Sequence, residues 1–183
     1  NFLDRSPSRY HAVANLCGEL EAAGYVRLYE GQCQPIVPGG KYFVTRGGSA
    51  LLAFRIPRAD FTGFMISASH SDSPTFRIKE NAELEGPETY VRLNTERYGG
   101  MLCAPWLDRP LTVAGQVMVK QGDDIQEQLV YVDRDLLMIP NVAVHMNRDA
   151  NNGFKYDAKC DMVPLMGMGL EKGTFRAAVA QAA

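Results

Sequence analysis

The stretch GFMISASHSDSP, residues Gly63–Pro74, is the one around which we expect the fold to be organised. The apolar run Phe64–Ala68 is typical of a strand buried inside a sheet, and we expect a strand over residues 62–69. His70 and Asp72 follow this run, and their side chains share one face of an extended segment because they are two residues apart. One imidazole nitrogen of His70 can then bind a metal or a substrate while the Asp72 carboxylate fixes the orientation of the ring.

A simpler structural interpretation of this pair stays open. His70 can cap the end of a strand, and Asp72 can begin a turn before Pro74. The spacing of the two residues fits both interpretations, so other parts of the chain have to distinguish them.

The composition is that of an ordinary globular protein. The chain has 183 residues, enough for one domain or two small ones. Its hydrophobic fraction is 46% and its charged fraction 22%, while the formal net charge of −2 provides no basic surface for nucleic acid or anionic lipid. No apolar run approaches the ~20 residues of a membrane helix. We expect neither a nucleic-acid partner nor a membrane partner.

The cysteines favour a cytoplasmic protein. They are widely separated and form no C-x-x-C pair, which argues against a zinc site built from thiolates. We interpret them as small buried hydrophobic residues in a reducing compartment. The four positions are Cys17, Cys33, Cys103 and Cys160. No signal peptide is recognisable at the amino end.

The ends of the sequence indicate part of a longer protein. The chain starts at Asn1 without an initiator methionine. It ends in Arg176–Ala183, a strong helix-forming segment without a terminating signal.

The first part of the chain predicts a helix followed by strands. Ser6 as the N-cap and Pro7 at the first helical position predict a helix over residues 10–23, and Gly24 is its expected end. His11, in the first turn of this helix, is interpreted as a structural residue because nothing beside it has metal-ligand spacing.

Two strands are predicted next, over residues 41–46 and 49–55, around a turn at Gly47-Gly48. A helix followed by strands indicates an α/β layered domain. His70 would lie at the carboxyl end of the strand over residues 62–69, where functional sites of such sheets are commonly found.

The composition changes after Pro74. We predict a short strand over residues 76–79 and a polar link over residues 81–88, with a domain boundary near residue 82. A β-rich module follows, with a hairpin loop at residues 121–124 and candidate strands over residues 90–95, 111–120 and 126–133.

Two segments of this module carry candidate functional residues. Trp106 stands beside Asp108 and Arg109, and this segment fits a core-filling loop as well as it fits an interface or a site. His145 follows an apolar segment, with Arg148 three residues on, and alone it fits a structural role.

Taken together, several segments resemble the aspartyl aminopeptidase family of zinc metallopeptidases. They occur in the family's order and cover residues 6 to about 165. The segments are SPSRYHA (Ser6–Ala12), SHSDSP (Ser69–Pro74), YGG (Tyr98–Gly100), WLDR (Trp106–Arg109) and IPNVAVHMNR (Ile139–Arg148).

The resemblance implies a fold and an assembly. An α/β zinc-peptidase domain, begun by residues 1–82, is interrupted by a β-rich dimerisation domain over residues 83–168, and residues 169–183 begin a helix leading back to the catalytic part. Family members are cytoplasmic homo-oligomers built from dimers, typically dodecamers. They remove an acidic residue, Asp or Glu, from peptide amino termini at a site with two zinc ions.

The resemblance also implies roles for three residues. His70 matches a zinc ligand, Asp72 the carboxylate that orients it, and His145 a histidine that reaches a neighbouring subunit's active site to stabilise the reacting carbonyl. The remaining zinc ligands and the glutamate base belong to a later part of the family's catalytic domain. We therefore expect residues 1–183 alone to be inactive and to bind zinc weakly.

Two other functions are consistent with the sequence. The chain can be a non-catalytic assembly module that dimerises through its β-rich half. It can also be a ligand-binding α/β protein that uses His70 for another purpose. Sequence beyond Ala183 would separate the enzyme from the assembly module.

Overall fold

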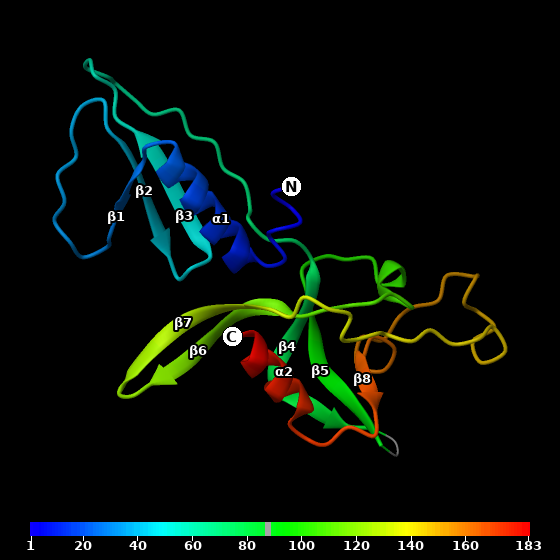
Figure 1. The fold of residues 1–183 in the computed structure, drawn as a ribbon. Coiled ribbons are helices and arrows are strands. Elements are labelled where there is room, and N and C mark those ends of the chain that lie inside the picture. The colour runs from blue at the N-terminus through cyan, green and yellow to red at the C-terminus, as the bar shows by residue number, and fades with distance from the viewer. Residues whose placement is uncertain (87–88) are drawn as a thin grey trace. The chain divides into compact units, whose positions relative to one another are not determined.

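The computed structural model describes residues 1–86 and 89–183 and shows a mixed α/β chain with small sheets (Figure 1). The chain divides into two units, Asn1–Asp72 and Ser73–Ala183. Among the described residues, neither helix has the length and apolar character needed to cross a membrane.

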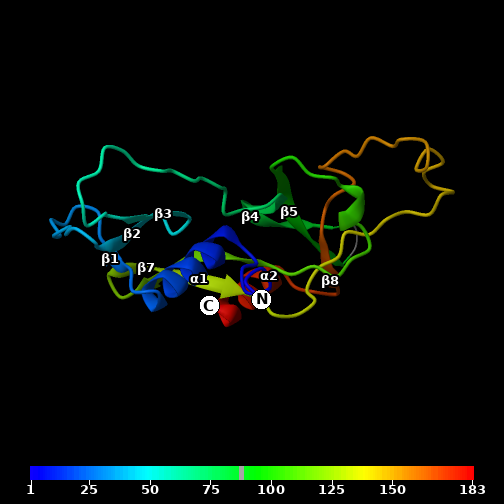
Figure 2. The ribbon, with the colours of Figure 1, turned by 90° about the horizontal axis from the view of Figure 1, so that it is seen from above.

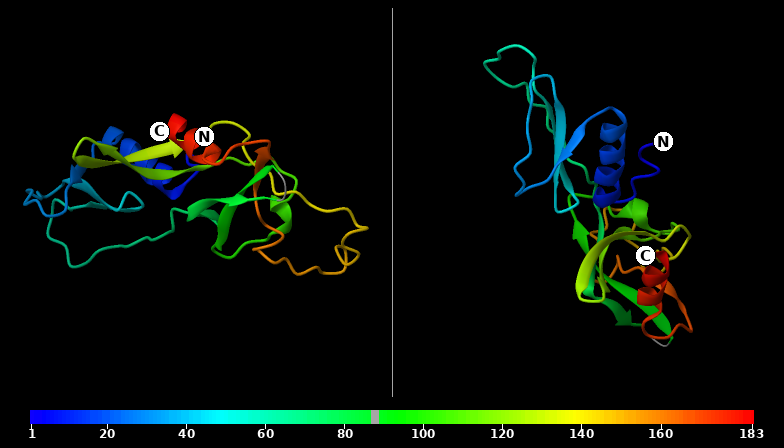
Figure 3. Two further views of the ribbon diagram at one scale, coloured as in Figure 1. Left: turned by 90° about the horizontal axis from the view of Figure 1, so that it is seen from below. Right: turned by 60° about the vertical axis from the view of Figure 1, so that its left-hand side comes forward.

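The first unit packs one helix on a three-stranded sheet. Helix α1 (Arg9–Ala22) is followed by strands β1 (Val26–Leu28), β2 (Lys41–Arg46) and β3 (Ala50–Arg55) in the order β1-β2-β3. Strand β1 is parallel to β2, and β3 is antiparallel to β2. Figure 3 shows α1 lying along this sheet. The core between the two layers contains the buried side chains of Val13, Cys17 and Phe43.

The predicted helix and hairpin are confirmed in this unit, but the predicted N-cap is wrong. The N-cap is Ser8, whose Oγ accepts a hydrogen bond from the His11 backbone N–H at 3.4 Å. Ser6 instead accepts from the Asn15 side chain at 3.0 Å, because the helix begins at Arg9, too late for Ser6 to reach its first turn. Gly24, with φ +79°, follows the helix as expected.

The predicted buried strand over residues 62–69 is wrong for the described residues. This segment is extended but belongs to no sheet, and its apolar side chains are exposed: Phe64 by 64%, Met65 by 104% and Ile66 by 86%. Figure 2 shows it as a single trace with no strand of its unit beside it. A central strand needs a neighbour on each side, and within the first unit β3 pairs only with β2.

The second unit is β-rich, as predicted. Strands β4, β5 and β8 form one antiparallel sheet in the order β4-β5-β8, and β6 and β7 form a hairpin. The bounds of its elements are β4 Thr75–Glu85, β5 Tyr90–Tyr98, the 3-10 helix η1 Ala104–Trp106, β6 Ala114–Gln121, β7 Asp124–Tyr131, β8 Leu165–Met168 and α2 Thr174–Ala182.

One core joins the sheet, the hairpin and the last helix. Leu93 of β5, Val130 of β7 and Phe175 of α2 are all buried in it. Helix α2 contacts β7, and the views of Figure 3 show the helix beside the hairpin. The turn of this hairpin is confirmed, with Gly122 at φ +63°.

The predicted polar link over residues 81–88 is wrong for its first half. Strand β4 continues to Glu85 and pairs with β5 after a register shift between Ile78 and Glu83, so polar residues on one face do not end the strand. Pro87 and Glu88 lie outside the described residues. The two units meet between Asp72 and Ser73, whereas the sequence places a boundary near residue 82, inside β4.

The interpretation of the cysteines is half correct. Cys17 and Cys103 are buried, whereas Cys33 and Cys160 are exposed, and all four are free thiols. Burial raises the pKa of the Cys17 thiol, which favours its neutral, inert form.

Candidate functional site

His70 and Asp72 are brought together as their spacing predicts. The His70 Nδ1 atom lies 2.6 Å from the Asp72 backbone carbonyl oxygen and 3.3 Å from the Asp72 Oδ1. A carbonyl oxygen only accepts hydrogen bonds, so Nδ1 carries the hydrogen and donates it. In neutral His70 the lone pair is then on Nε2, which is the nitrogen able to bind a metal ion.

The surroundings of the pair are open rather than enclosed. The His70 side chain is 82% exposed, while that of Asp72 is 29% exposed. Between them, the Ser71 hydroxyl donates a hydrogen bond to the Ser49 carbonyl at 3.2 Å, which ties this segment to the turn between β2 and β3. The imidazole is therefore oriented by its own segment and is accessible to a further ligand.

The described residues supply only part of a zinc site. No group of three or more His, Cys, Asp or Glu side chains in residues 1–86 and 89–183 is placed to hold a metal ion. A catalytic zinc ion usually has three protein ligands. His70 fits a zinc ligand in chemistry and orientation, but the described donor set does not fit a complete zinc centre.

His145 lies in a turn of the second unit. The Ala143 carbonyl accepts hydrogen bonds from the backbone N–H groups of Met146 at 2.8 Å and Asn147 at 3.3 Å, which closes this turn around His145. The imidazole is exposed, and no hydrogen bond or ion pair holds it within the described part of the chain. The structural role that the sequence left open for His145 therefore has no contact to support it.

The Trp106 segment is held by packing and backbone contacts. Trp106 packs edge-to-face on Phe76, with ring centroids 5.1 Å apart, and contributes to the cluster around Ile139. Asp108 accepts a hydrogen bond from the Asn141 backbone N–H at 2.9 Å. This favours a structural interpretation of Trp106. The sequence-based interpretation of Asp108 was a solvated residue or a site residue. Its contact with the Asn141 backbone was not predicted, because the sequence contains no signal for it.

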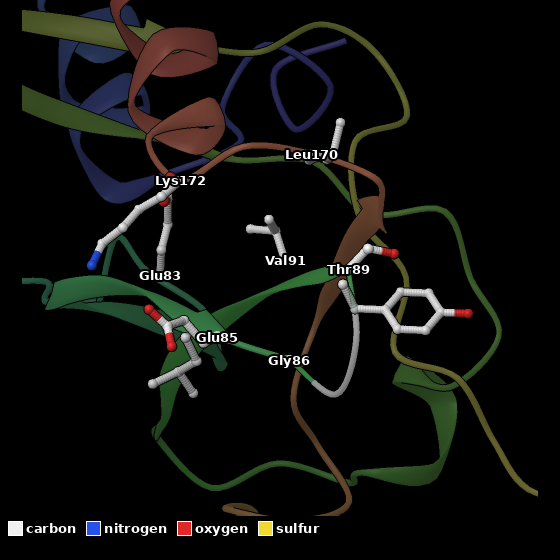
Figure 4. A pocket seen from close by; sticks show the side chains of 9 residues that line it. Glu83, Glu85, Gly86, Thr89, Val91, Leu170 and Lys172 are labelled. Atoms are coloured by element: carbon white, nitrogen blue, oxygen red, sulfur yellow. The ribbon is translucent and has the colours of Figure 1, made fainter.

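One cavity among the described residues lies away from these side chains. Its volume is about 230 Å³, and it is lined partly by Glu83, Val91, Leu170 and Lys172 (Figure 4). The Glu83 side chain extends toward the start of α2, where it accepts hydrogen bonds from backbone N–H groups. None of the predicted site residues lines this cavity, so it gives no support to a substrate site there.

Comparison with known proteins identifies relatives over most of the chain. The family model described as aminopeptidase I zinc metalloprotease (M18) matches residues 2–178. A probable M18 family aminopeptidase 2 of Clostridium acetobutylicum is 41% identical over 172 residues, which are 92% of this chain. The chain spans 40% of the length of that relative.

Solved structures agree with this result. The chain resembles a protein in the cryo-EM structure of the Ape4 and Nbr1 complex, with a TM-score of 0.87, 38% identity, and coverage of 94% of this chain and 34% of that one. The S. cerevisiae mApe1 dodecamer matches with a TM-score of 0.75 at 22% identity, covering 100% of this chain and 42% of that one. The second likeness concerns the fold alone.

Proposed function

This chain belongs to the aminopeptidase I zinc metalloprotease family (M18), and we propose that the whole protein removes acidic residues, Asp or Glu, from the amino termini of peptides. The acidic preference rests on the resemblance of the SHSDSP, WLDR and AVHMNR segments to aspartyl aminopeptidases. In this proposal residues 1–183 contribute one zinc ligand and one oxyanion-stabilising group to each active site.

The observation that carries the proposal is the close contact of the His70 Nδ1 atom with Asp72. Asp72 accepts the hydrogen of Nδ1 and leaves Nε2 to bind zinc. Bound zinc would supply Lewis-acid polarisation of the scissile carbonyl and an acidified water. Asp72 acts on the ring and not on the substrate, so it is a positioning residue. The other ligands of the two zinc ions and the general base are contributed by residues outside this chain.

His145 is proposed as a donor to the developing oxyanion in the active site of a neighbouring subunit. Its exposure and its lack of a partner within the described residues leave the imidazole available for such a contact. This role requires a homo-oligomer. We propose a cytoplasmic dimer-based particle, a dodecamer in its complete form, in which the β-rich segment over residues 83–168 is the dimerisation domain.

The test compares two histidine variants of the whole protein. His70→Ala is expected to lose one zinc ion per active site, while His145→Ala keeps its zinc and lowers kcat by about 100-fold or more, the usual cost of removing one oxyanion donor. Zinc is measured by elemental analysis, and kcat is measured on peptides beginning with Asp, Glu, Ala or Leu.

His11→Ala is the matched control, because His11 is a histidine of the same chain that contacts the N-cap of α1. Equal zinc loss in the His70 and His145 variants would contradict the division of roles. Equal rates on acidic and apolar amino termini would contradict the substrate class. A protein that assembles without binding zinc or cleaving peptides would instead be an assembly module.

A further inference from the structure

The segment that carries His145 leaves the second unit and returns to it at one buried cluster. Ile139 and Met162, at the two ends of this excursion, are both 0% exposed and pack in the same cluster with Cys103. Between them residues 140–161 form turns without a strand or helix, and the segment projects from the rest of its unit in Figures 1 and 2. The direction in which His145 is presented therefore depends on how the chain leaves Ile139.

Asp108 holds that point of departure from two sides. Its backbone N–H donates a hydrogen bond to the Ile139 carbonyl at 2.9 Å, and its Oδ1 accepts one from the Asn141 N–H at 2.9 Å. Leu107, the preceding residue, forms a β-bridge with Ile139. Asp108 thus fixes the backbone on both sides of Pro140.

The backbone of Asp108 is unusual in a way that fits this role. Its φ of +55° is in the left-handed region, and it is the one non-glycine residue with positive φ among the described residues. Asp and Asn tolerate this conformation better than most residues, but it is unfavourable without compensating contacts. Here the two hydrogen bonds at Ile139 and Asn141 compensate for it.

A short series of hydrogen bonds continues from Asp108 to His145. The Asn141 side-chain Oδ1 accepts from the Val142 N–H at 2.8 Å, and the turn that begins at Ala143 encloses His145. No residue from Asn141 to His145 is buried, so packing does not hold this stretch. Among the described residues, the hydrogen bond from the Asn141 N–H ties this stretch to Asp108, next to Leu107 of the buried cluster.

We propose that Asp108 is a positioning residue for His145, setting the path by which the segment 140–161 presents the imidazole to the neighbouring active site. This inference rests on the proposed role of His145. Asp108 touches neither substrate nor metal in it. Loss of the Oδ1 acceptor leaves His145 in the molecule but displaces it, and a displacement of about 1 Å can cost up to about 100-fold in rate.

The experiment uses the whole enzyme with Asp108→Gly and Asp108→Asn. Glycine accepts φ +55° without strain but removes the acceptor, whereas asparagine keeps both an Oδ1 acceptor and tolerance of this backbone. We expect Asp108→Gly to lower kcat about 10- to 100-fold at unchanged zinc content and little changed KM. Asp108→Asn is expected to stay within about threefold of the parent. Asp123→Gly, in the exposed β6–β7 turn, is the matched control.

Two further measurements separate positioning from a general loss of structure. Hydrogen exchange at the Asn141 amide should accelerate in Asp108→Gly but not in Asp108→Asn. The double variant Asp108→Gly/His145→Ala should have the kcat of His145→Ala alone, since a displaced and an absent imidazole contribute equally little.

The possible results separate the positioning role of Asp108 from the proposed function on which it rests. If His145→Ala lowers kcat while Asp108→Gly does not, or if the two effects multiply in the double variant, the positioning role is wrong and the proposed function stands. Equal impairment in Asp108→Asn and Asp108→Gly would also overturn it, because the acceptor would not be the cause. If His145→Ala keeps full kcat, both the role of His145 and that of Asp108 fail.

Discussion

Two segments that the sequence predicts as strands, the one containing Phe64–Ala68 and the one that forms strand β5, differ in the structure. Strand β5 is paired with β4 on one side and β8 on the other, and its Leu93 is 0% exposed. The segment before His70 has no strand partner in the described residues, and its Ile66 is 86% exposed. Phe64–Ala68 is the more apolar of the two segments, so hydrophobicity alone does not decide between a strand and an exposed coil.

This difference shows that a segment forms a strand only where neighbouring elements pair with it and cover it. Backbone N–H and C=O groups of an extended segment are satisfied by an adjacent strand, and its side chains are buried by a covering layer. Strand β5 obtains both from β4, β8 and the core of its own unit. The His70 segment obtains neither within residues 1–72, and this explains the failure of a prediction based on composition.

The largest predicted effect compares Leu93→Ala with Ile66→Ala in residues 1–183. Leu93→Ala should reduce the free energy of unfolding by about 2–5 kcal/mol, because it leaves a cavity in a closed core. Ile66→Ala should change it by less than about 0.5 kcal/mol, because the side chain is already in water. Urea unfolding followed by circular dichroism measures both.

In the whole protein the same pair sharpens the comparison. If the segment before His70 becomes a paired strand there, the cost of Ile66→Ala should approach that of Leu93→Ala. A large cost of Ile66→Ala in residues 1–183 alone would break the comparison, because it would mean that this segment is already packed.

Local signals made much of the fold predictable. The Gly47-Gly48 and Gly122 turns were predicted because their positive φ is a property of the residue itself, and Gly24 ended α1 for the same reason. The N-cap is misassigned because Ser6 before Pro7 fits the usual pattern of a cap followed by proline, whereas the helix begins two residues later and Ser8 caps it. Strand β4 was underestimated because its pairing with β5 outweighs its polar composition.

The candidate site was predictable to a similar degree. The contact between His70 and Asp72 follows from a spacing of two residues, since it is local. The contact between Asp108 and Asn141 spans 33 residues, and a sequence pattern does not reveal which distant amide a carboxylate will meet. The same holds for Glu83 at the start of α2.

An intermediate loss of stability is predicted for Glu83→Ala, because Glu83 caps α2, the last helix of the second unit. The N-cap of α2 is Gly173, which has no capping side chain, and Glu83 accepts hydrogen bonds from the N–H groups of Gly173 at 2.5 Å and Phe175 at 2.9 Å. Glu83→Ala should cost about 1 kcal/mol, since it removes an N-terminal cap and a favourable charge. Thermal unfolding, with hydrogen exchange of residues 174–182, measures the loss.

Glu85→Ala is the control for this prediction, because Glu85 is on the same strand and its side chain makes no hydrogen bond in the described structure. Equal losses from Glu83→Ala and Glu85→Ala would show that overall charge, rather than capping, is responsible. A loss confined to Glu83 would show that a contact between residues far apart in sequence completes the second unit.

The smallest predicted effect concerns His11, in the ordered part of the first unit. The Ser8 hydroxyl lies 2.8 Å from the His11 Nδ1, and burial lowers the pKa of His11 from its ordinary value of 6.5. The unfolded chain therefore takes up a proton at a higher pH than the folded chain. Stability should fall as pH decreases through about 6.5 toward the lowered pKa, and the loss is complete below it. Above pH 7.5 this group contributes no pH dependence.

His11→Gln, which does not titrate, should flatten this part of the stability profile between pH 7.5 and pH 5 in urea unfolding of residues 1–183. The variant keeps His70 and His145, so the difference between the two profiles belongs to His11. Because α1 and the sheet of β1, β2 and β3 bury their core without residues 62–69, Ile66→Ala should leave the profile unchanged. A profile altered by Ile66→Ala would mean that the exposed segment and the helix are energetically coupled, and the contrast between packed and unpaired segments would no longer hold within the first unit.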